Sequence, residues 1–272
     1  MTTAVEPKTH SKPTIRVTQP RAITAEWIKL RSLRSTWFSF AAALIVAIGL
    51  GILFSALRGH DIHTHGIVGP DFDPTELSLR GMFLAQLAVG VLGVMFVTGE
   101  YSTGMIRASL TAVPRRVPVF VAKLVVFAGV TFVIATIASL IAFLGGQAAL
   151  HSYHLGVAIS SPGAARAVIG GGLYLTIVGL LALGCGFALR NTGGAIATLF
   201  GLLLVLPILG SALPASWQVH VNKYLPMNAG TAIMTTGHHS DMLTPWQGIG
   251  VFALYALAAL VIGLAILRRR DA

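Results

Sequence analysis

Charge is what this sequence has least of. Only 10% of its 272 residues are Asp, Glu, Lys or Arg, whereas ordinary soluble domains carry about 25%. Acidic residues are the rarer kind, with nine Asp and Glu against 19 Lys and Arg. Because 55% of the residues are hydrophobic, so few charges cannot cover the apolar surface in water. The composition therefore argues against a soluble globular protein.

Three further absences narrow the class of protein. Cys185 is the sole cysteine, which excludes an internal disulfide. Residues 1–20 are rich in Thr, Pro and Lys and contain no apolar run, which indicates a flexible cytoplasmic tail rather than a cleavable signal peptide. The chain has no Gly-x-x-x-x-Gly-Lys-Ser/Thr motif. We therefore expect no nucleotide, metal or other cofactor bound by this chain, and no catalytic residue.

Long apolar runs are what the sequence has instead. Six runs, almost free of charge, occupy residues 37–57, 81–99, 119–144, 167–189, 193–213 and 246–267. About 20 helical residues match a hydrocarbon core of about 30 Å, so each run is long enough to cross a bilayer. The predicted fold class is an all-α integral membrane protein. Its six transmembrane helices form one domain, residues 37–272.

The basic residues predict the orientation. Six spans put both termini on one side of the membrane. Of the 19 lysines and arginines, only Arg58, Arg80, Arg166 and Lys223 fall on the opposite side. The positive-inside rule then predicts cytoplasmic termini in a bacterial plasma membrane. Topology and anionic lipids explain the net charge of +10 better than nucleic-acid binding does.

Residues 21–36, before the first span, have an amphipathic pattern. One face carries Ile23, Trp27, Leu30, Leu33 and Trp37, and the other carries Glu26, Lys29, Arg31 and Arg34. A basic, Trp-bearing amphipathic helix is typical of the membrane interface. The alternative is a plain cytoplasmic extension of the first span.

Ionisable residues are missing from the middle of every predicted span. Glu100, Lys123, Arg166 and Arg190 all lie at span ends. Ion-driven carriers and pumps normally place such groups inside the membrane, where they are costly and functional. Energy for uphill transport would therefore have to come from another protein through a cytoplasmic contact.

The candidate contact is the polar stretch GEYSTGMIRASLTAVPRR at residues 99–116. Met105, Ile106, Ser109 and Leu110 favour a short amphipathic helix parallel to the membrane, ended by Pro114. A helix of this kind suits a cleft on a moving cytoplasmic partner. The alternative is an ordinary connecting loop whose arginines only set the topology.

This stretch resembles the first intracellular loop of ABC transporter permeases of the type-2 exporter class, especially small actinobacterial drug and antibiotic exporters. Three more segments agree in order: EWIKLRS (26–32), YLPMNAG (224–230) and LRRRDA (267–272). The similarity covers nearly the whole chain and includes the span count. It does not extend to an ATPase domain, so the chain resembles a permease-only half-transporter.

The resemblance implies partners and roles. A separate ABC ATP-binding subunit would bind ATP and magnesium, and a second permease copy or paralogue would complete a dimer. The ATPase interface would comprise Glu100, Tyr101, Gly104, Arg107, Arg115 and Arg116, beside the interfacial-helix residues Trp27, Lys29, Arg31 and Arg34. A re-entrant outer segment before the last span would contain Tyr224, Pro226 and Asn228. Pro226 removes a backbone donor there, which fits a broken segment.

Two stripes of small residues bear on dimerisation. Span one has Ala43, Ala47, Gly51 and Ser55 at four-residue spacing, and span five has Gly193, Ala197 and Gly201. Such stripes let helices approach closely in lipid, within one chain or between two. The resemblance favours span five as the dimer seam. Pro207 predicts a kink in the same helix.

Histidines gather on the predicted outer side. His60, His63 and His65, with Asp61, have a spacing compatible with zinc or copper, or with pH sensing. The alternative is that they are solvated loop residues.

The predicted function is the permease subunit of an ATP-driven exporter whose cargo is amphipathic or hydrophobic: a drug, antibiotic, peptide or lipid-like molecule. Two rivals stay open, namely a metal-dependent membrane enzyme using the outer histidines and a non-transporting anchor or sensor for a cytoplasmic ATPase. The sequence leaves open the cargo, the choice of homodimer or heterodimer, and export or import.

Overall fold

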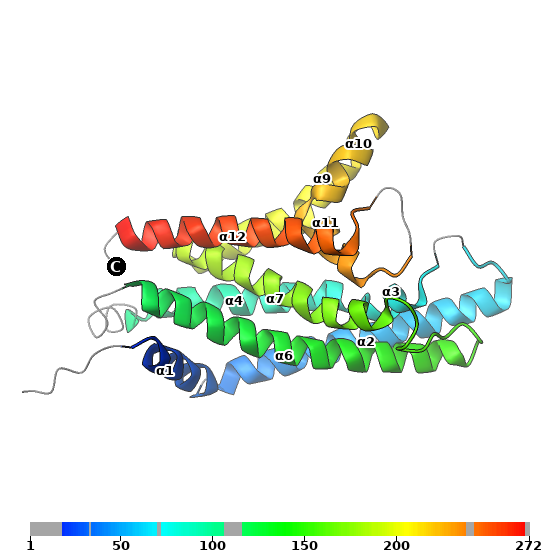
Figure 1. Cartoon of the computed structure of the whole chain (residues 1–272), viewed down its shortest axis with the longest axis horizontal. Helices are drawn as coiled ribbons and strands as arrows, with labels where there is room; N and C mark the ends of the chain where they lie inside the picture. Colours follow the sequence, from blue (N-terminus) through cyan, green and yellow to red (C-terminus); the bar gives the residue numbers. More distant parts are fainter. Residues whose placement is uncertain (1–17, 33, 70–71, 106–115, 238–241, 270–272) are drawn as a thin grey trace, which may run out of the picture.

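The computed structural model describes residues 18–32, 34–69, 72–105, 116–237 and 242–269, and every element within these ranges is helical (Figure 1). Most of the predicted tail 1–20 and residues 106–115 of the predicted contact stretch lie outside the described residues. The long helices run side by side in one elongated bundle.

Six helical stretches are long and apolar enough to cross a membrane. They are α2 (Arg34–His65), α3 with α4 (Pro74–Leu79 and Met82–Ser102), α6 (Arg116–His151), α7 (Ala164–Leu189), the broken helix from Thr192 to Ser211, and α12 (Pro245–Arg269). Each matches one predicted run, so the six-span, all-α prediction is confirmed. Span five ends at Ser211, inside its predicted run, whereas α2 extends past its run to His65, which places His60, His63 and His65 on a helix rather than in a loop.

The two ends of the bundle differ in what they contain. The helix α1 (Gln19–Ser32) and the last turn of α12 lie at the same end, which we call the terminal end (Figure 1). The helix α3 and the short helices before α12 lie towards the opposite end, which we call the far end. An even number of spans requires α1 and the end of α12 to lie at the same end of the bundle.

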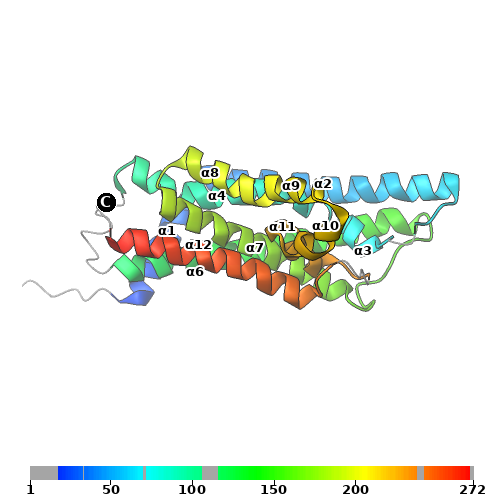
Figure 2. The ribbon, with the colours of Figure 1, turned by 90° about the horizontal axis from the view of Figure 1, so that it is seen from above.

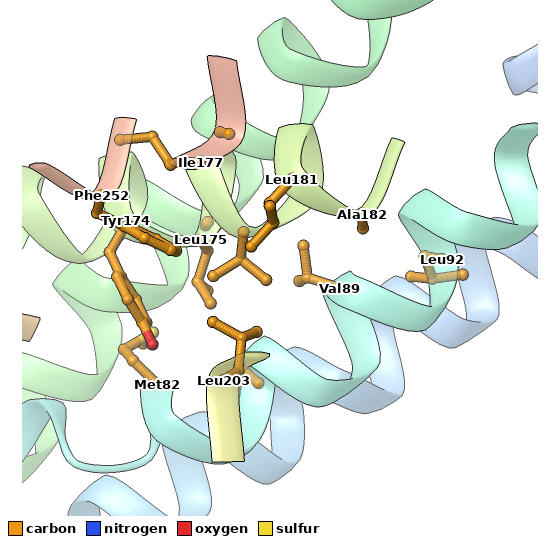
Figure 3. Packing of buried hydrophobic residues seen from close by; sticks show 14 of the residues in the cluster. Met82, Val89, Leu92, Tyr174, Leu175, Ile177, Leu181, Ala182, Leu203 and Phe252 are labelled. Carbon is orange, nitrogen blue, oxygen red and sulfur yellow. The ribbon is translucent and has the colours of Figure 1, made fainter. Parts of the chain in front are cut away.

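The centre of the bundle is α7, which packs against α4, α6 and α12. Small residues allow the close approach: a Cβ on Gly172 would lie 2.0 Å from Thr136 Oγ1, and one on Gly184 would lie 2.7 Å from the Ala259 backbone. Figure 3 shows the packed side chains, with Tyr174 and Leu181 of α7 among residues of α4 and α12. Since lipid tails are as apolar as the side chains, tight packing rather than water exclusion holds these helices together.

The span-one stripe also packs within the chain. Ala43, Ala47, Gly51 and Ser55 are all buried. A Cβ added to Gly51 would lie 2.3 Å from the carbonyl oxygen of Ser78 in α3. This stripe therefore lets α2 approach α3 and the start of α4.

The structure corrects the predicted boundary of the first helix. The prediction was one interfacial helix over residues 21–36, but α1 ends at Ser32 and α2 begins at Arg34. Arg34 thus belongs to the first span. The face of α1 that packs on the bundle is also different: Ala22, Glu26 and Leu30 are buried, whereas Trp27 is 41% exposed.

Span five is interrupted where Pro207 was predicted to kink it. The α-helix α8 (Thr192–Phe200) passes into a π-helical turn, η1 (Gly201–Val205), and resumes as α9 (Leu206–Ser211). Proline has no backbone N–H, so the helix before it cannot keep a regular hydrogen-bond ladder. Beyond the turn, α9 and α10 (Ala215–Val221) project away from the other spans (Figure 1).

The segment before α12 consists of short helices, most of them buried, rather than another long helix. After η2 (Asn222–Tyr224) come α11 (Pro226–Thr231) and η3 (Ala232–Met234), with Ala229, Ala232 and Ile233 almost fully buried. Pro226 begins α11, where its missing N–H costs nothing. A Cβ on Gly230 would lie 2.7 Å from both Tyr174 and Phe252, so this segment is seated closely on α7 and α12.

Candidate functional site

Four charged side chains meet at the terminal end of the bundle. Glu26 and Lys29 come from α1, Glu100 from the last turns of α4, and Lys123 from the start of α6. Lys123 Nζ lies 2.7 Å from Glu26 Oε2 and 2.7 Å from Glu100 Oε1. Lys29 Nζ lies 2.8 Å from Glu26 Oε1 and 3.1 Å from Glu100 Oε1. We call these four residues the charge cluster.

The charge cluster is buried but electrically balanced. Lys123 is fully buried, and Glu26 and Glu100 are 3% and 9% exposed. A buried charge is costly unless it is paired and hydrogen-bonded, and here two ammonium groups face two carboxylates. The ring of Phe96 adds a cation–π contact, with Lys123 Nζ 4.7 Å from its centroid. The cluster therefore fixes the register of three helices.

Lys29 stays charged in this setting. Burial lowers its pKa, but the hydrogen bond to Glu26 and the attraction of Glu100 and Glu26 raise it, and the net direction is upward. The pKa of Lys29 therefore lies above its ordinary value of 10.5. Lys29 is therefore protonated at physiological pH.

One carboxylate oxygen of the cluster is unused. Glu100 Oε2 is buried and accepts no hydrogen bond from the residues that the structure describes. An unsatisfied buried acceptor next to a polar connecting stretch is a candidate for an additional donor. Glu100 lies directly before Ser102–Gly104, where α4 ends.

Two arginines anchor the end of α12 beside the cluster. Arg116 Nη1 donates to the Leu267 carbonyl at 2.6 Å, and Arg190 Nη2 donates to the Ile266 carbonyl at 3.3 Å. Cations at a helix C-terminus satisfy its last carbonyls and complement its dipole. The Arg190 guanidinium also lies 5.2 Å from the centre of the Tyr101 ring. The ends of α4, α6, α7 and α12 are thereby joined.

The structure brings together only part of the predicted ATPase interface. Glu100, Tyr101, Lys29 and Arg116 lie in or beside the charge cluster and make contacts within the chain. Gly104 is exposed with a positive φ of 71°, and Trp27 and Arg31 are exposed on α1. Arg107 and Arg115 lie outside the described residues, as does the side chain of Arg34.

Sequence reasoning missed Lys123 and Glu26 as a pair. It treated Lys123 as a topological cation and placed Glu26 on the exposed face of α1. A signal was present: Lys123 follows a run of apolar residues inside α6, where an unpaired ammonium would be expensive. That cost requires a carboxylate partner, and Glu26 and Glu100 are the described carboxylates at this end.

A second polar arrangement holds the far end. The carboxylate of Asp73 caps α3 by accepting from the Thr75 and Glu76 amides at 2.9 and 3.1 Å. It also accepts from the amides of Thr236 and Gly237, beyond η3. Arg166 of α7 donates to the carbonyls of Ile233 and Thr235 at 2.9 and 2.8 Å. We call Asp73 and Arg166 the far-end clamp.

The predicted re-entrant residues lie next to this clamp. Asn228 Nδ2 donates to the Asn222 carbonyl at 2.9 Å, which ties α11 to η2. Tyr224 is exposed, and Pro226 is buried at the start of α11. The buried Tyr174 hydroxyl donates to Gln86, whose amide lies 3.7 Å from the Met227 sulfur of α11.

The histidines do not form a metal centre in the part of the chain that is described. No group of three or more His, Cys, Asp or Glu side chains there could hold a metal ion. His60 and His63 pack against the Tyr153 ring, and His65 contacts Asp61. His238 and His239 lie outside the described residues.

Comparison with known protein families gives a match that fits this architecture. The family model described as ABC-2 family transporter protein matches residues 22–208, from α1 through the π turn of span five. No curated protein matches the sequence. Members of the family are non-catalytic membrane permeases without a cofactor of their own, and they associate with an ABC ATPase subunit. Because the match covers most of the chain, this protein belongs to the ABC-2 family of transporter membrane proteins.

Proposed function

We propose that this permease exports an amphipathic or hydrophobic molecule across a bacterial plasma membrane, with both termini in the cytoplasm. The basic residues at the terminal end support that orientation. The scarcity of polar side chains within the spans supports the class of cargo. A drug, an antibiotic, a peptide or a lipid-like molecule would fit.

The observation that carries the proposal is the charge cluster. It joins α1 to the ends of α4 and α6, the two helices between which residues 103–115 run. An ATPase that binds this stretch and α1 would therefore push on elements already linked by ion pairs. Movement of the stretch would shift α1, α4 and α6 together rather than bend one of them.

The exposed residues around the cluster would form the ATPase contact. Trp27 and Arg31 on α1 and Gly104 after α4 are accessible, and Arg107, Arg115 and Arg116 continue the same stretch. In this arrangement Glu100 transmits movement through Lys29 and Lys123 while its unused Oε2 remains available to a donor on the connecting stretch.

The test is to separate ATP hydrolysis from transport. The permease with Glu100→Gln is reconstituted with its ATPase in vesicles, beside Ser102→Ala, an exposed change two residues away. We expect both complexes to assemble and hydrolyse ATP, but only Glu100→Gln to lose most ATP-driven export of fluorescent amphipathic dyes that the wild type moves. Unchanged dye export in Glu100→Gln would refute the coupling role, and wild-type complex that exports no such dye would refute the cargo class.

We also propose that a second permease packs along span five. Gly193 and Ala197 are exposed and Gly201 is partly exposed, while Ala195, Leu199 and Leu203 face the chain's own core. A Cβ on Gly201 would meet no atom within 4 Å. The stripe is thus open to another helix, as close packing in lipid requires.

Bulky substitutions on this stripe test the seam. Gly193→Leu with Gly201→Leu should weaken the dimer measured by crosslinking in membranes. The control is Gly49→Leu with Gly129→Leu, because both glycines also have open space where a Cβ would stand. An undiminished dimer, or equal loss in both double variants, would place the seam elsewhere.

A further inference from the structure

A membrane-facing groove lies on α7 between span five and α12. It has a volume of about 310 Å³, and its lining is almost wholly apolar. The floor includes Gly184, Cys185 and Ala188 of α7, and the walls include Leu202 on one side and Ala258 and Ile262 on the other. Figure 2 shows α7 between α8 and α12 in this region. Small side chains on α7 therefore leave an opening between its two neighbours.

The groove leads towards a group of cations. Its α7 floor ends at Leu189, directly before Arg190, whose guanidinium reaches the Ile266 carbonyl of α12. On α12, Tyr255 and Ile262 are seven residues apart, and Arg269 follows seven residues later. Seven residues make nearly two helical turns, so these three side chains share one face. Arg268 and Arg269 are exposed at the terminal end, where a headgroup layer would lie.

The apolar lining of the groove and the cations beyond its end indicate the kind of occupant. An alkyl chain is thin enough to enter, and the apolar lining suits it. The dimer stripe of Gly193, Ala197 and Gly201 is made of other residues, so the two surfaces are separate.

We infer that the groove holds an acyl chain of an anionic phospholipid, with the phosphate near Arg190 and Arg269. Basic residues at the membrane surface, above an apolar site between helices, are the expected combination for such a lipid. The bound chain fills the space beside α7 and links span five to α12. This inference concerns the bundle alone and does not depend on the proposed export function.

Native mass spectrometry of the purified permease tests the site with phosphatidylglycerol and phosphatidylcholine as probes. Wild-type protein should keep one phosphatidylglycerol per chain in preference to phosphatidylcholine. Ala258→Phe, which fills the groove, should release it, whereas Ala253→Phe on an exposed part of the same helix outside the groove should not. Arg269→Gln, on the groove face, should weaken the preference about fivefold, whereas Arg268→Gln, on another face of α12, should weaken it less.

A second measurement detects the lipid in the groove directly, by crosslinking. A benzophenone amino acid at Ile262 should crosslink mainly to phosphatidylglycerol in mixed vesicles, while the same residue at Leu254, exposed but outside the groove, should capture both lipids equally. Equal lipid capture at both positions, equal behaviour of the two Ala→Phe variants, or a protein–protein adduct at Ile262 would each overturn the assignment.

Discussion

The two ends of this bundle are held in different ways. At the terminal end, the charge cluster joins three helices through contacts between side chains alone. At the far end, Asp73 and Arg166 hold the chain mainly through its backbone amides and carbonyls. Side-chain ion pairs can follow a helix that shifts, because lysine stems are flexible. Bonds to a fixed run of backbone groups cannot, and Arg116 and Arg190 hold α12 in that way at the terminal end too. The side-chain pairs between α1, α4 and α6 are therefore the more suitable place for transmitted movement.

The largest expected effect comes from removing the buried cation of the charge cluster. Lys123→Met would leave two buried carboxylates facing Lys29 alone, and breaking a buried ion pair costs about 3–5 kcal/mol. The free energy of unfolding should fall by about that amount, seen as a lower unfolding temperature in detergent.

The matched control neutralises the three buried members of the cluster. Lys123→Met with Glu26→Gln and Glu100→Gln removes their charges together and leaves only Lys29, whose side chain is 27% exposed. Replacing a complete buried ion group is often nearly neutral. The triple variant should therefore be more stable than the single variant. If the single variant were the more stable of the two, an uncompensated buried charge would not explain the effect of Lys123→Met.

The second effect, at the far end, should be local. Asp73→Asn loses one of two acceptor oxygens that serve the amides of α3 and of Thr236 and Gly237. Each buried donor left without a partner costs about 1–3 kcal/mol. Hydrogen exchange should rise in residues 226–237 while the terminal end keeps its protection.

Asp61→Asn is the control. Asp61 pairs with Arg58 in an exposed position, and such an ion pair contributes about 0–1 kcal/mol to stability. Faster exchange of the charge-cluster helices in Asp73→Asn would contradict the separation of the two ends.

The sequence could predict the six spans because length and apolarity decide them, and it located Glu100, Arg166 and Arg190 at span ends. It could not predict the pairing of Glu26 with Lys123, because the two are 97 residues apart and only packing brings them together. The amphipathic pattern of α1 predicted that its apolar face would lie against the membrane. The observed face buries Glu26 instead, since tertiary ion pairs outweigh a weak helical pattern. The contacts of Asp73 were likewise not predictable, because its partners beyond η3 become adjacent only in the fold.

The smallest effect is expected for the exposed side of the charge cluster, and it separates the roles of the two lysines. The Lys29 side chain is 27% exposed, so Lys29→Gln should cost no more than about 1 kcal/mol after solvent screening. Its raised pKa sets the sign of the pH effect: the contribution is complete below pH 10.5 and is lost only as the pH rises through the raised value. Wild-type and Lys29→Gln proteins should therefore show a constant difference in unfolding temperature between pH 6 and pH 9, approximate limits set well below that pKa. A difference that shrank across this range would mean that Lys29 titrates near neutrality. The ion pairs of Lys29 would then depend on pH within the physiological range rather than persist throughout it.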